Sequence, residues 1–112
     1  MQNVAEFRII GRVGKVEIKD KVAFLDVAAN YSRKVDDQWE DDPHWHRLTL
    51  FGKNVERAKK IGKSDLLHVT GRVRQSSFER ECVREYRVDL IAERFAVLVR
   101  SGGPADRDYE AD

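Results

Sequence analysis

Five stretches of this chain either alternate apolar with polar residues or are rich in β-branched residues, and short polar or glycine-containing segments separate them. Side chains of a β-strand point alternately to its two faces, so each stretch predicts a strand with one buried face. The composition agrees, because 13 valines and 5 isoleucines stand against 7 leucines. Gly11 interrupts the first strand and predicts a bend or bulge there. The predicted strands cover residues 4–13 with 15–18, 22–28, 44–51, 66–74 and 86–95.

A single helical segment is predicted between the third and fourth strands. Asn54 can cap its start and Gly62 can end it. Its apolar residues recur at intervals of three, at Val55, Ala58 and Ile61. Five strands in this order predict an all-β fold, a five-stranded Greek-key barrel of the OB type with one short helix between strands 3 and 4. A β-sandwich is the competing architecture, but it needs more strands than the sequence shows.

The chain of 112 residues is expected to form one domain, because two domains would leave neither with a usable core. Residues 1–100 are predicted to form the OB-fold domain, and residues 101–112 a flexible acidic tail. The tail begins with Ser101-Gly102-Gly103-Pro104, which is typical of a linker, and its last eight residues hold four acidic residues and one arginine. Residues 1–104 hold 20 basic and 16 acidic residues, a balance that suits a body that binds a polyanion.

Several classes of protein are set aside by features that the sequence lacks. No apolar stretch approaches the roughly 18 residues that a membrane helix needs, and residues 1–6 lack the basic and apolar pattern of a secretory signal. Cys82 is the single cysteine, so it forms neither an intramolecular disulfide nor a thiolate-rich zinc site. We therefore expect a soluble cytoplasmic protein with no membrane contact.

The strand over residues 44–51 carries the strongest functional signal. Its Leu48 and Leu50 are expected in the core, so the alternate side chains point outward, including Trp45, Arg47 and Phe51. Two exposed aromatic rings that bracket an arginine indicate a binding face, because bases stack on such rings while cations neutralise phosphates. A hydrophobic contact between subunits is the alternative interpretation.

Residues 31–43 lack periodicity and are predicted to be a long exposed loop. Trp39 in this loop could stack on a base, or it could clamp the loop to the body. Tyr31 and Arg33, at the start of the loop, could contact nucleic acid or remain solvated.

Residues 76–84 are predicted to be a second polar excursion. It contains Phe78, with Arg74 before it and Arg80 after it, a pattern typical of a stacking finger. The alternative is that Phe78 anchors the tip of its loop.

Several short motifs, taken in order, resemble bacterial single-stranded DNA-binding proteins. They extend over about residues 4–98. The motifs are Ile10-Gly11-Arg12-Val13-Gly14, Trp45-His46-Arg47, Phe51-Gly52-Lys53, Val69-Thr70-Gly71-Arg72-Val73-Arg74 and Tyr86 followed by Asp89-Leu90-Ile91-Ala92. The resemblance implies an OB-fold homotetramer that binds single-stranded DNA without sequence preference, in replication, recombination and repair, at the nucleoid. It implies no catalysis, no metal and no cofactor.

The resemblance also assigns roles to residues. It implies that Trp45 and Phe51 stack on bases, that Arg47, Lys53 and Arg74 contact the DNA backbone, and that Phe78 and Trp39 add aromatic platforms. We add Arg72 as a further guide for the backbone. The complete expected interface is Trp45, Phe51, Arg47, Lys53, Arg74, Arg72, Phe78, Trp39, Tyr31 and Arg33.

The chain departs from the family pattern at several positions, as a short or divergent member would. Arg33 stands where some members have a stacking tryptophan, so that role is lost or passes to Tyr31. Ser76 and Ser77 replace basic residues, which weakens the expected phosphate contact there. The long family tail, whose acidic tip ends in Pro-Phe, is missing, and recruitment of replication and repair proteins through residues 101–112 is left open.

Two other functions are considered. In a metalloenzyme, His44 and His46 on one strand face and His68 elsewhere could bind zinc. However, Leu48 and Leu50 share that face, and no acidic residue is suitably placed to act as a general base. In an adaptor, the same barrel would bind protein, because an OB fold does not determine function.

Overall fold

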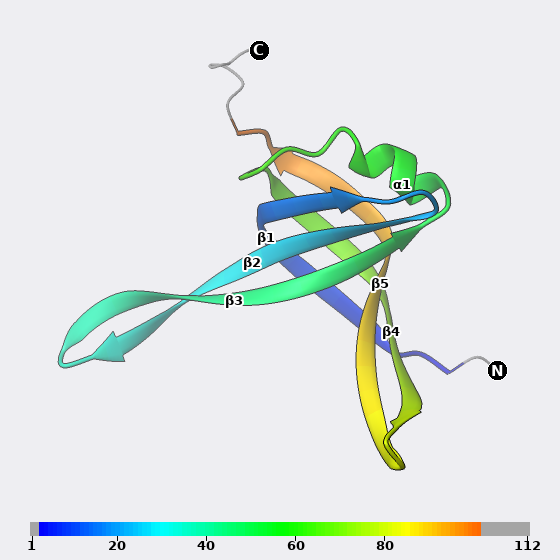
Figure 1. The fold of residues 1–112 in the computed structure, drawn as a ribbon. Helices are drawn as coiled ribbons and strands as arrows, with labels where there is room; N and C mark the ends of the chain where they lie inside the picture. Colours follow the sequence, from blue (N-terminus) through cyan, green and yellow to red (C-terminus); the bar gives the residue numbers. More distant parts are fainter. Residues whose placement is uncertain (1–2, 102–112) are drawn as a thin grey trace.

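Residues 3–101 are described by the computed structural model, and they form five long β-strands and one short helix (Figure 1). The elements are β1 Glu6–Ile18, β2 Val22–Val35, β3 Gln38–Phe51, α1 Lys53–Ala58, β4 Leu66–Arg80 and β5 Val83–Val99. Within these residues, no helix has the length and apolar character needed to cross a membrane. The tail predicted from residue 101 lies outside the described residues, except for Ser101 itself.

The strands close into a barrel in the order β1-β2-β3-β5-β4. Adjacent strands are antiparallel except β3 and β5, which close the barrel through a short parallel contact at Leu48 with Leu90 and Thr49 with Ile91. The five-stranded barrel with one helix between β3 and β4 confirms the OB-type prediction. The closed strand order also decides against a β-sandwich.

The core of the barrel is formed by alternate residues of the strands, as the sequence pattern predicts. Leu25, Leu48, Leu50 and Leu67 are fully buried. Helix α1 adds Val55 and Ala58 to this core, and Ile61 follows it in the next loop. The helix therefore packs its apolar side against the barrel, which agrees with the three-residue spacing in the sequence.

The start and end of α1 differ from the prediction. Gly52, with φ of 61°, occupies the N-cap position, where no side chain caps the helix. Asn54 lies inside the helix, and its side-chain amide donates to the carbonyl oxygens of Ala92 and Glu93, at 3.3 Å each. Its polar side chain thus serves a tertiary contact. The helix ends at Ala58 and does not extend to Gly62.

Strand β1 bends so that it joins two parts of the barrel. Residues 6–12 pair with β4, whereas residues 12–18 pair with β2. The irregularity predicted at Gly11 lies instead between Val13 and Lys15, where the register with β2 shifts. A Cβ at Gly11 would collide with the carbonyl oxygen of Ala28, so this glycine permits close approach of two strands.

Two hairpin arms extend from the barrel, as Figure 1 shows, and both replace predicted irregular segments. Residues 31–43 are not a loop: they belong to β2 and β3, which remain paired from Val22 with Phe51 to Val35 with Gln38. A tight turn at Asp36 and Asp37, with φ of 50° and 64°, joins the strands. Because both faces of this arm are largely exposed, its sequence has no apolar alternation.

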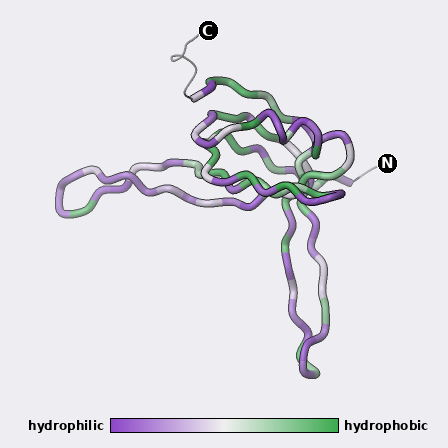
Figure 2. The backbone as a smooth tube through the Cα atoms, turned by 45° about the horizontal axis from the view of Figure 1, so that its top comes forward, coloured by the Kyte–Doolittle hydropathy of each residue, from purple (hydrophilic) through white to green (hydrophobic). Residues whose placement is uncertain are grey.

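Residues 76–84 belong to the second arm, in which β4 and β5 are paired out to Arg80 with Val83. Glu81 and Cys82, with φ of 52° and 66°, form its tight turn. Figure 2 shows that hydrophobic residues gather in the barrel while both arms are mainly hydrophilic. We call these hairpins the β2–β3 arm (residues 31–43) and the β4–β5 arm (residues 74–87).

Candidate nucleic-acid interface

The two faces of β3 are divided as the sequence predicts. Leu48 and Leu50 are fully buried, whereas Trp45 and Phe51 are 59% and 45% exposed. Two large apolar rings therefore lie on the outer surface of the barrel. Their exposure is unfavourable in water unless a ligand or partner covers them.

The ring of Trp45 lies over a part of β1 that has no side chain. A Cβ placed on Gly14 would collide with ring atoms Cζ3 and Cη2 of Trp45. The cross-strand neighbour of Trp45 on β2 is the small residue Ala28. The indole thus rests on a floor of backbone and small side chains, next to the register shift of β1.

Arg47, two residues further along β3, is held by three groups from neighbouring strands. Its Nη2 donates to Oε1 of Glu17 at 2.9 Å, and its Nη1 donates to Oδ1 of Asp26 at 3.3 Å. Its Cζ lies 4.4 Å from the ring centroid of Phe24, a cation–π contact. We call Arg47, Glu17, Asp26 and Phe24 the arginine clamp.

The clamp also shifts the pKa values of Glu17 and Arg47. The hydrogen bond from Arg47 lowers the pKa of Glu17, and nearby positive charges, led by Lys19, lower it further. The same hydrogen bond raises the pKa of Arg47, with a further contribution from the charge of Asp26. Both groups therefore remain charged at neutral pH, and the guanidinium charge is matched by two carboxylates.

Two grooves run beside the clamp, and Arg47 belongs to both. The Trp45 groove has a volume of about 470 Å³ and is lined by Gly14, Lys15, Asp26, Trp45, His46 and Arg47. The Phe51 groove has a volume of about 550 Å³ and is lined by Val22, Phe24, Arg47, Thr49, Phe51, Arg74, Arg87, Val88 and Asp89. Trp45 and Phe51, the two exposed rings of β3, thus line two adjacent grooves that share Arg47.

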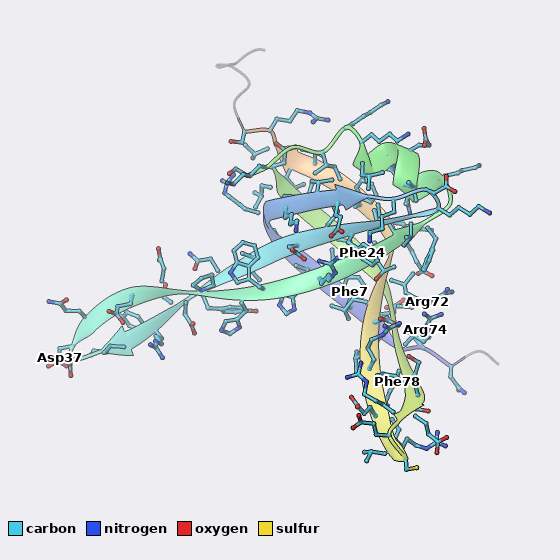
Figure 3. The ribbon with its side chains drawn as sticks, viewed as in Figure 1. Phe7, Phe24, Asp37, Arg72, Arg74 and Phe78 are labelled. Carbon is cyan, nitrogen blue, oxygen red and sulfur yellow. The ribbon has the colours of Figure 1, made fainter. Side chains whose placement is uncertain are left out.

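The β4–β5 arm continues this surface. Arg74 and Arg87 both reach the carboxylate of Asp89, at 3.2 and 3.3 Å, and Arg72 lies 3.8 Å from Glu93. Figure 3 shows Arg72, Arg74 and Phe78 following one another from the barrel along this arm.

Phe78 lies on the same face of the arm as these two arginines. The cross-strand pairs Arg74 with Asp89 and Phe78 with Glu85 are separated by an even number of residues, so their side chains share a face. Phe78 is 41% exposed. The structure therefore brings Phe78, Arg72 and Arg74 to the side of the molecule that carries the Phe51 groove.

Two lysines close to these rings in the structure or in the sequence form no ion pair within residues 3–101. Among residues 3–101, neither Lys15 nor Lys53 has a carboxylate within 4.0 Å, and both side chains are exposed. Lys15 lines the Trp45 groove, and Lys53 follows Phe51 closely along the chain. These lysines can attract phosphate without first breaking an ion pair.

Tyr31 and Arg33 lie apart from this surface. The register of β2 with β3 places them on the opposite face of the ribbon from Trp45, together with His44 and His46. The ring of Tyr31 lies 4.8 Å from that of His44. The structure therefore does not bring Tyr31 or Arg33 together with Trp45, Arg47 and Phe51.

Trp39 lies near the tip of the β2–β3 arm and is 71% exposed. It shares the ribbon face of Trp45, with Lys34 as its cross-strand neighbour, but five acidic residues lie near it along the chain. They are Asp36, Asp37, Glu40, Asp41 and Asp42, of which Glu40 and Asp42 lie on the opposite face of the ribbon. The ring is available for stacking, while the local charge opposes the approach of phosphates.

The histidines considered as zinc ligands do not converge. In the part of the chain from residue 3 to 101, no three His, Cys, Asp or Glu residues are grouped so that they could hold a metal ion. His44 lies 3.1 Å from Asp42 on the arm, whereas His68 is on β4, paired with Ile10.

Sequence reasoning missed several residues of this surface, namely Gly14, Lys15, Glu17, Phe24, Asp26 and Arg87. Each lies on β1, β2 or β5, and only the register of these strands beside β3 brings them to the interface. The alternation of residues 22–28 already places Phe24 and Asp26 on the outer face. That pattern could have identified both.

Three solved structures share this fold at low sequence identity. A mitochondrial single-stranded DNA-binding protein from S. cerevisiae matches with a TM-score of 0.66 and 17% identity, over 89% of this chain and 100% of that chain. Plasmodium falciparum SSB, in a complex with single-stranded DNA, matches with a TM-score of 0.67 and 21% identity, over 88% and 97%. A small single-stranded DNA-binding protein from Streptomyces coelicolor matches with a TM-score of 0.63 and 14% identity, over 86% and 95%.

These structural matches establish the fold, and a comparison of the sequence with family models establishes the family. Residues 4–98 match the single-strand binding protein family. This range contains all five strands except the last residue of β5, together with α1 and both grooves. The chain belongs to the single-strand binding protein family.

Proposed function

We propose that this chain binds single-stranded DNA without sequence preference, by stacking bases on the outer face of β3 and by attracting phosphates to the cations around it. Membership of the single-strand binding protein family makes single-stranded DNA its ligand. The observation that carries the mechanism is the exposure of Trp45 and Phe51 above a buried leucine layer, each ring beside a groove.

The exposed rings favour single strands over duplexes. Bases in a duplex are stacked on one another and their faces are covered, whereas an unpaired base can lie flat on Trp45 or Phe51. For proteins of this class, such stacking contributes about 1–3 kcal/mol per base. Every base has a flat face, so this interaction does not depend on sequence.

The cations provide a path for the phosphates. Lys15 lines the Trp45 groove and Lys53 lies two residues after Phe51; neither has a carboxylate partner among residues 3–101. Arg72 and Arg74 lie toward Phe78. We propose that the DNA strand passes from the Trp45 groove to the Phe51 groove and on to the β4–β5 arm. Trp39 adds a platform beyond the other end of this path, where the charge is less favourable.

The proposed role is a non-catalytic one. A sequence-independent single-strand binder protects DNA that is exposed in replication, recombination and repair, and it acts where the DNA lies, in the cytoplasm. The solved complex of Plasmodium falciparum SSB with single-stranded DNA supports the mode of binding, because that protein shares this fold.

We further propose that the chain acts as a homo-oligomer, as a tetramer by resemblance to the family. The first half of β1, residues 6–11, pairs with β4 but not with β2, so one backbone edge is free within the described chain. Ile10 on this half is 52% exposed. Light scattering tests the proposal, since a tetramer contains four copies of the 13.0 kDa chain.

The stacking mechanism is tested by comparing Trp45→Ala with Tyr31→Ala. These two aromatic side chains are almost equally exposed, at 59% and 58%, but lie on opposite faces of the β2–β3 ribbon. We expect Trp45→Ala to weaken binding of oligo-thymidine by about tenfold or more and Tyr31→Ala to leave it unchanged, as measured by fluorescence anisotropy of a labelled oligonucleotide. Equal losses in the two variants would contradict a binding path along the outer face of β3.

A further inference from the structure

Arg47 differs from the other cations of the interface in how completely its charge is matched. Two carboxylates, those of Glu17 and Asp26, lie 2.9 and 3.3 Å from its guanidinium nitrogens. A phosphate that approached Arg47 would meet the negative charge of both. Sequence reasoning assigned Arg47 to the DNA backbone, but these ion pairs make it a poor phosphate ligand.

The neighbours of Arg47 fix the orientation of its guanidinium group as well as neutralise its charge. Its Cζ lies over the ring of Phe24, 4.4 Å from the ring centroid, while the two carboxylates accept hydrogen bonds from its nitrogens. Contacts from β1 and β2 thus restrict a side chain that is otherwise free to rotate. A preorganised planar group loses little conformational entropy when a ligand stacks on it.

The remaining surface of this plane is accessible. The Arg47 side chain is 49% exposed, and it lines both the Trp45 groove and the Phe51 groove. Trp45, Arg47 and Phe51 occupy positions of the same parity on β3, so their side chains lie on one face. Nucleic-acid bases stack on guanidinium planes as they do on aromatic rings.

We infer that Arg47 is a base-stacking platform, supported by Phe24 and oriented by Glu17 and Asp26, and that it is not a phosphate contact. The inference rests on the proposed function, because it specifies how one residue of that interface holds a nucleotide. The outer face of β3 then offers three planar groups in series, Trp45, Arg47 and Phe51. The phosphate contacts near the Trp45 groove fall to Lys15.

The salt dependence of binding separates the two roles. A residue that neutralises a phosphate releases counterions, so its loss flattens the plot of log K against log salt concentration by about 0.7. We expect Arg47→Ala to lower oligo-thymidine affinity by about tenfold at every salt concentration, without changing this slope. Lys15→Ala, the matched control in the same groove, is expected to flatten it.

Two further variants distinguish stacking from charge and from a structural role. Arg47→Lys keeps the charge but loses the plane, so it is expected to bind as weakly as Arg47→Ala. The double variant Glu17→Gln, Asp26→Asn frees the guanidinium and is expected to steepen the slope by about 0.7. A merely structural role of Arg47 predicts no steepening.

An abasic deoxyribose-phosphate oligomer of equal length completes the test. Without bases it cannot stack, so the wild-type protein and Arg47→Ala are expected to bind it equally. The inference would be overturned if Arg47→Lys recovered the affinity, or if Arg47→Ala showed a flattened slope or an unchanged affinity. It would also be overturned if the slope of the double variant were unchanged, or if Arg47→Ala bound the abasic oligomer more weakly than the wild-type protein does. Failure of the wild-type protein to bind oligo-thymidine would instead refute the proposed function, and the inference with it.

Discussion

The two hairpin arms are built alike but carry different charges. Both extend a pair of barrel strands beyond the core, and both end in a two-residue turn with positive φ, at Asp36-Asp37 and Glu81-Cys82. The β2–β3 arm holds five acidic and two basic residues, whereas the β4–β5 arm holds three acidic and four basic residues. Figure 3 shows Asp37 and Phe78 on separate arms that point in different directions.

From this difference we expect that an exposed aromatic residue is not sufficient for binding DNA. Trp39 is more exposed than Phe78, at 71% against 41%. The cross-strand neighbours do not explain the contrast, since Phe78 faces Glu85 and Trp39 faces Lys34. However, Phe78 shares a face with Arg72 and Arg74 on an arm with more basic than acidic residues, whereas the β2–β3 arm has more acidic than basic residues. Because a DNA strand carries a phosphate at every nucleotide, the charge around a ring decides whether bases reach it. We therefore expect the β4–β5 arm to contribute more to binding.

The largest effect within this comparison is expected from Phe78→Ala. The loss of one stacking platform should weaken oligo-thymidine binding by about tenfold, at all salt concentrations. Tyr86→Ala is the control, since Tyr86 is 65% exposed and lies on the opposite face of the same arm. Fluorescence anisotropy measures both. An equal loss of affinity in Tyr86→Ala would show that the DNA strand does not follow the face of the arm that carries Phe78.

A second prediction concerns the charge of the β2–β3 arm. The variant Asp36→Asn, Asp37→Asn, Glu40→Gln, Asp41→Asn leaves Asp42 as the only acidic residue of this arm. Removing four exposed charges should strengthen oligo-thymidine binding by about fivefold at low salt, since each exposed charge interaction is worth a few tenths of a kcal/mol.

The turn of this arm should tolerate the change, because asparagine adopts positive φ readily. The gain in affinity should disappear near 1 M salt, where the Debye length is only about 3 Å. Titrations at low and high salt measure this. An unchanged affinity at low salt would place the DNA path far from this arm.

The contrast between the arms also shows what the sequence could predict. Residues 44–51 were assigned correctly because Leu48 and Leu50 are buried on one face, which produces an apolar alternation. The arms have no buried face, so residues 31–43 show no such alternation. Their extended conformation comes from backbone pairing and from the turn at Asp36-Asp37.

The candidate site was predictable where it depends on one strand and not where it depends on several. Trp45 and Phe51 follow from the alternation of β3 alone. The arginine clamp joins Arg47 to residues 21 and 30 positions away, Asp26 and Glu17, so no local pattern indicates it. Gly14 likewise becomes the floor beneath Trp45 only through the register of three strands.

A smaller effect is expected from Asp89→Asn on the β4–β5 arm. Asp89 binds both Arg74 and Arg87, and its side chain is 14% exposed. Its neutralisation frees two cations beside the Phe51 groove, so binding should strengthen by about threefold and the salt slope should steepen by up to about 0.7 for each arginine. Salt titrations test this. A flatter slope would show that Asp89 holds the arginines in the geometry that phosphates require.

The smallest effect is expected from Trp39→Ala. The acidic residues of the β2–β3 arm keep phosphates away, so loss of this ring should change oligo-thymidine affinity by less than about twofold, well below the value of a stacked base. The same substitution in the neutralised arm, where Asp42 is the one acidic residue left, should lower the affinity more, because the DNA can then reach the ring. This double-mutant comparison isolates the effect of charge on stacking. A tenfold loss in the unmodified arm would mean that the strand reaches Trp39 despite its acidic surroundings, and the two arms would then be equivalent.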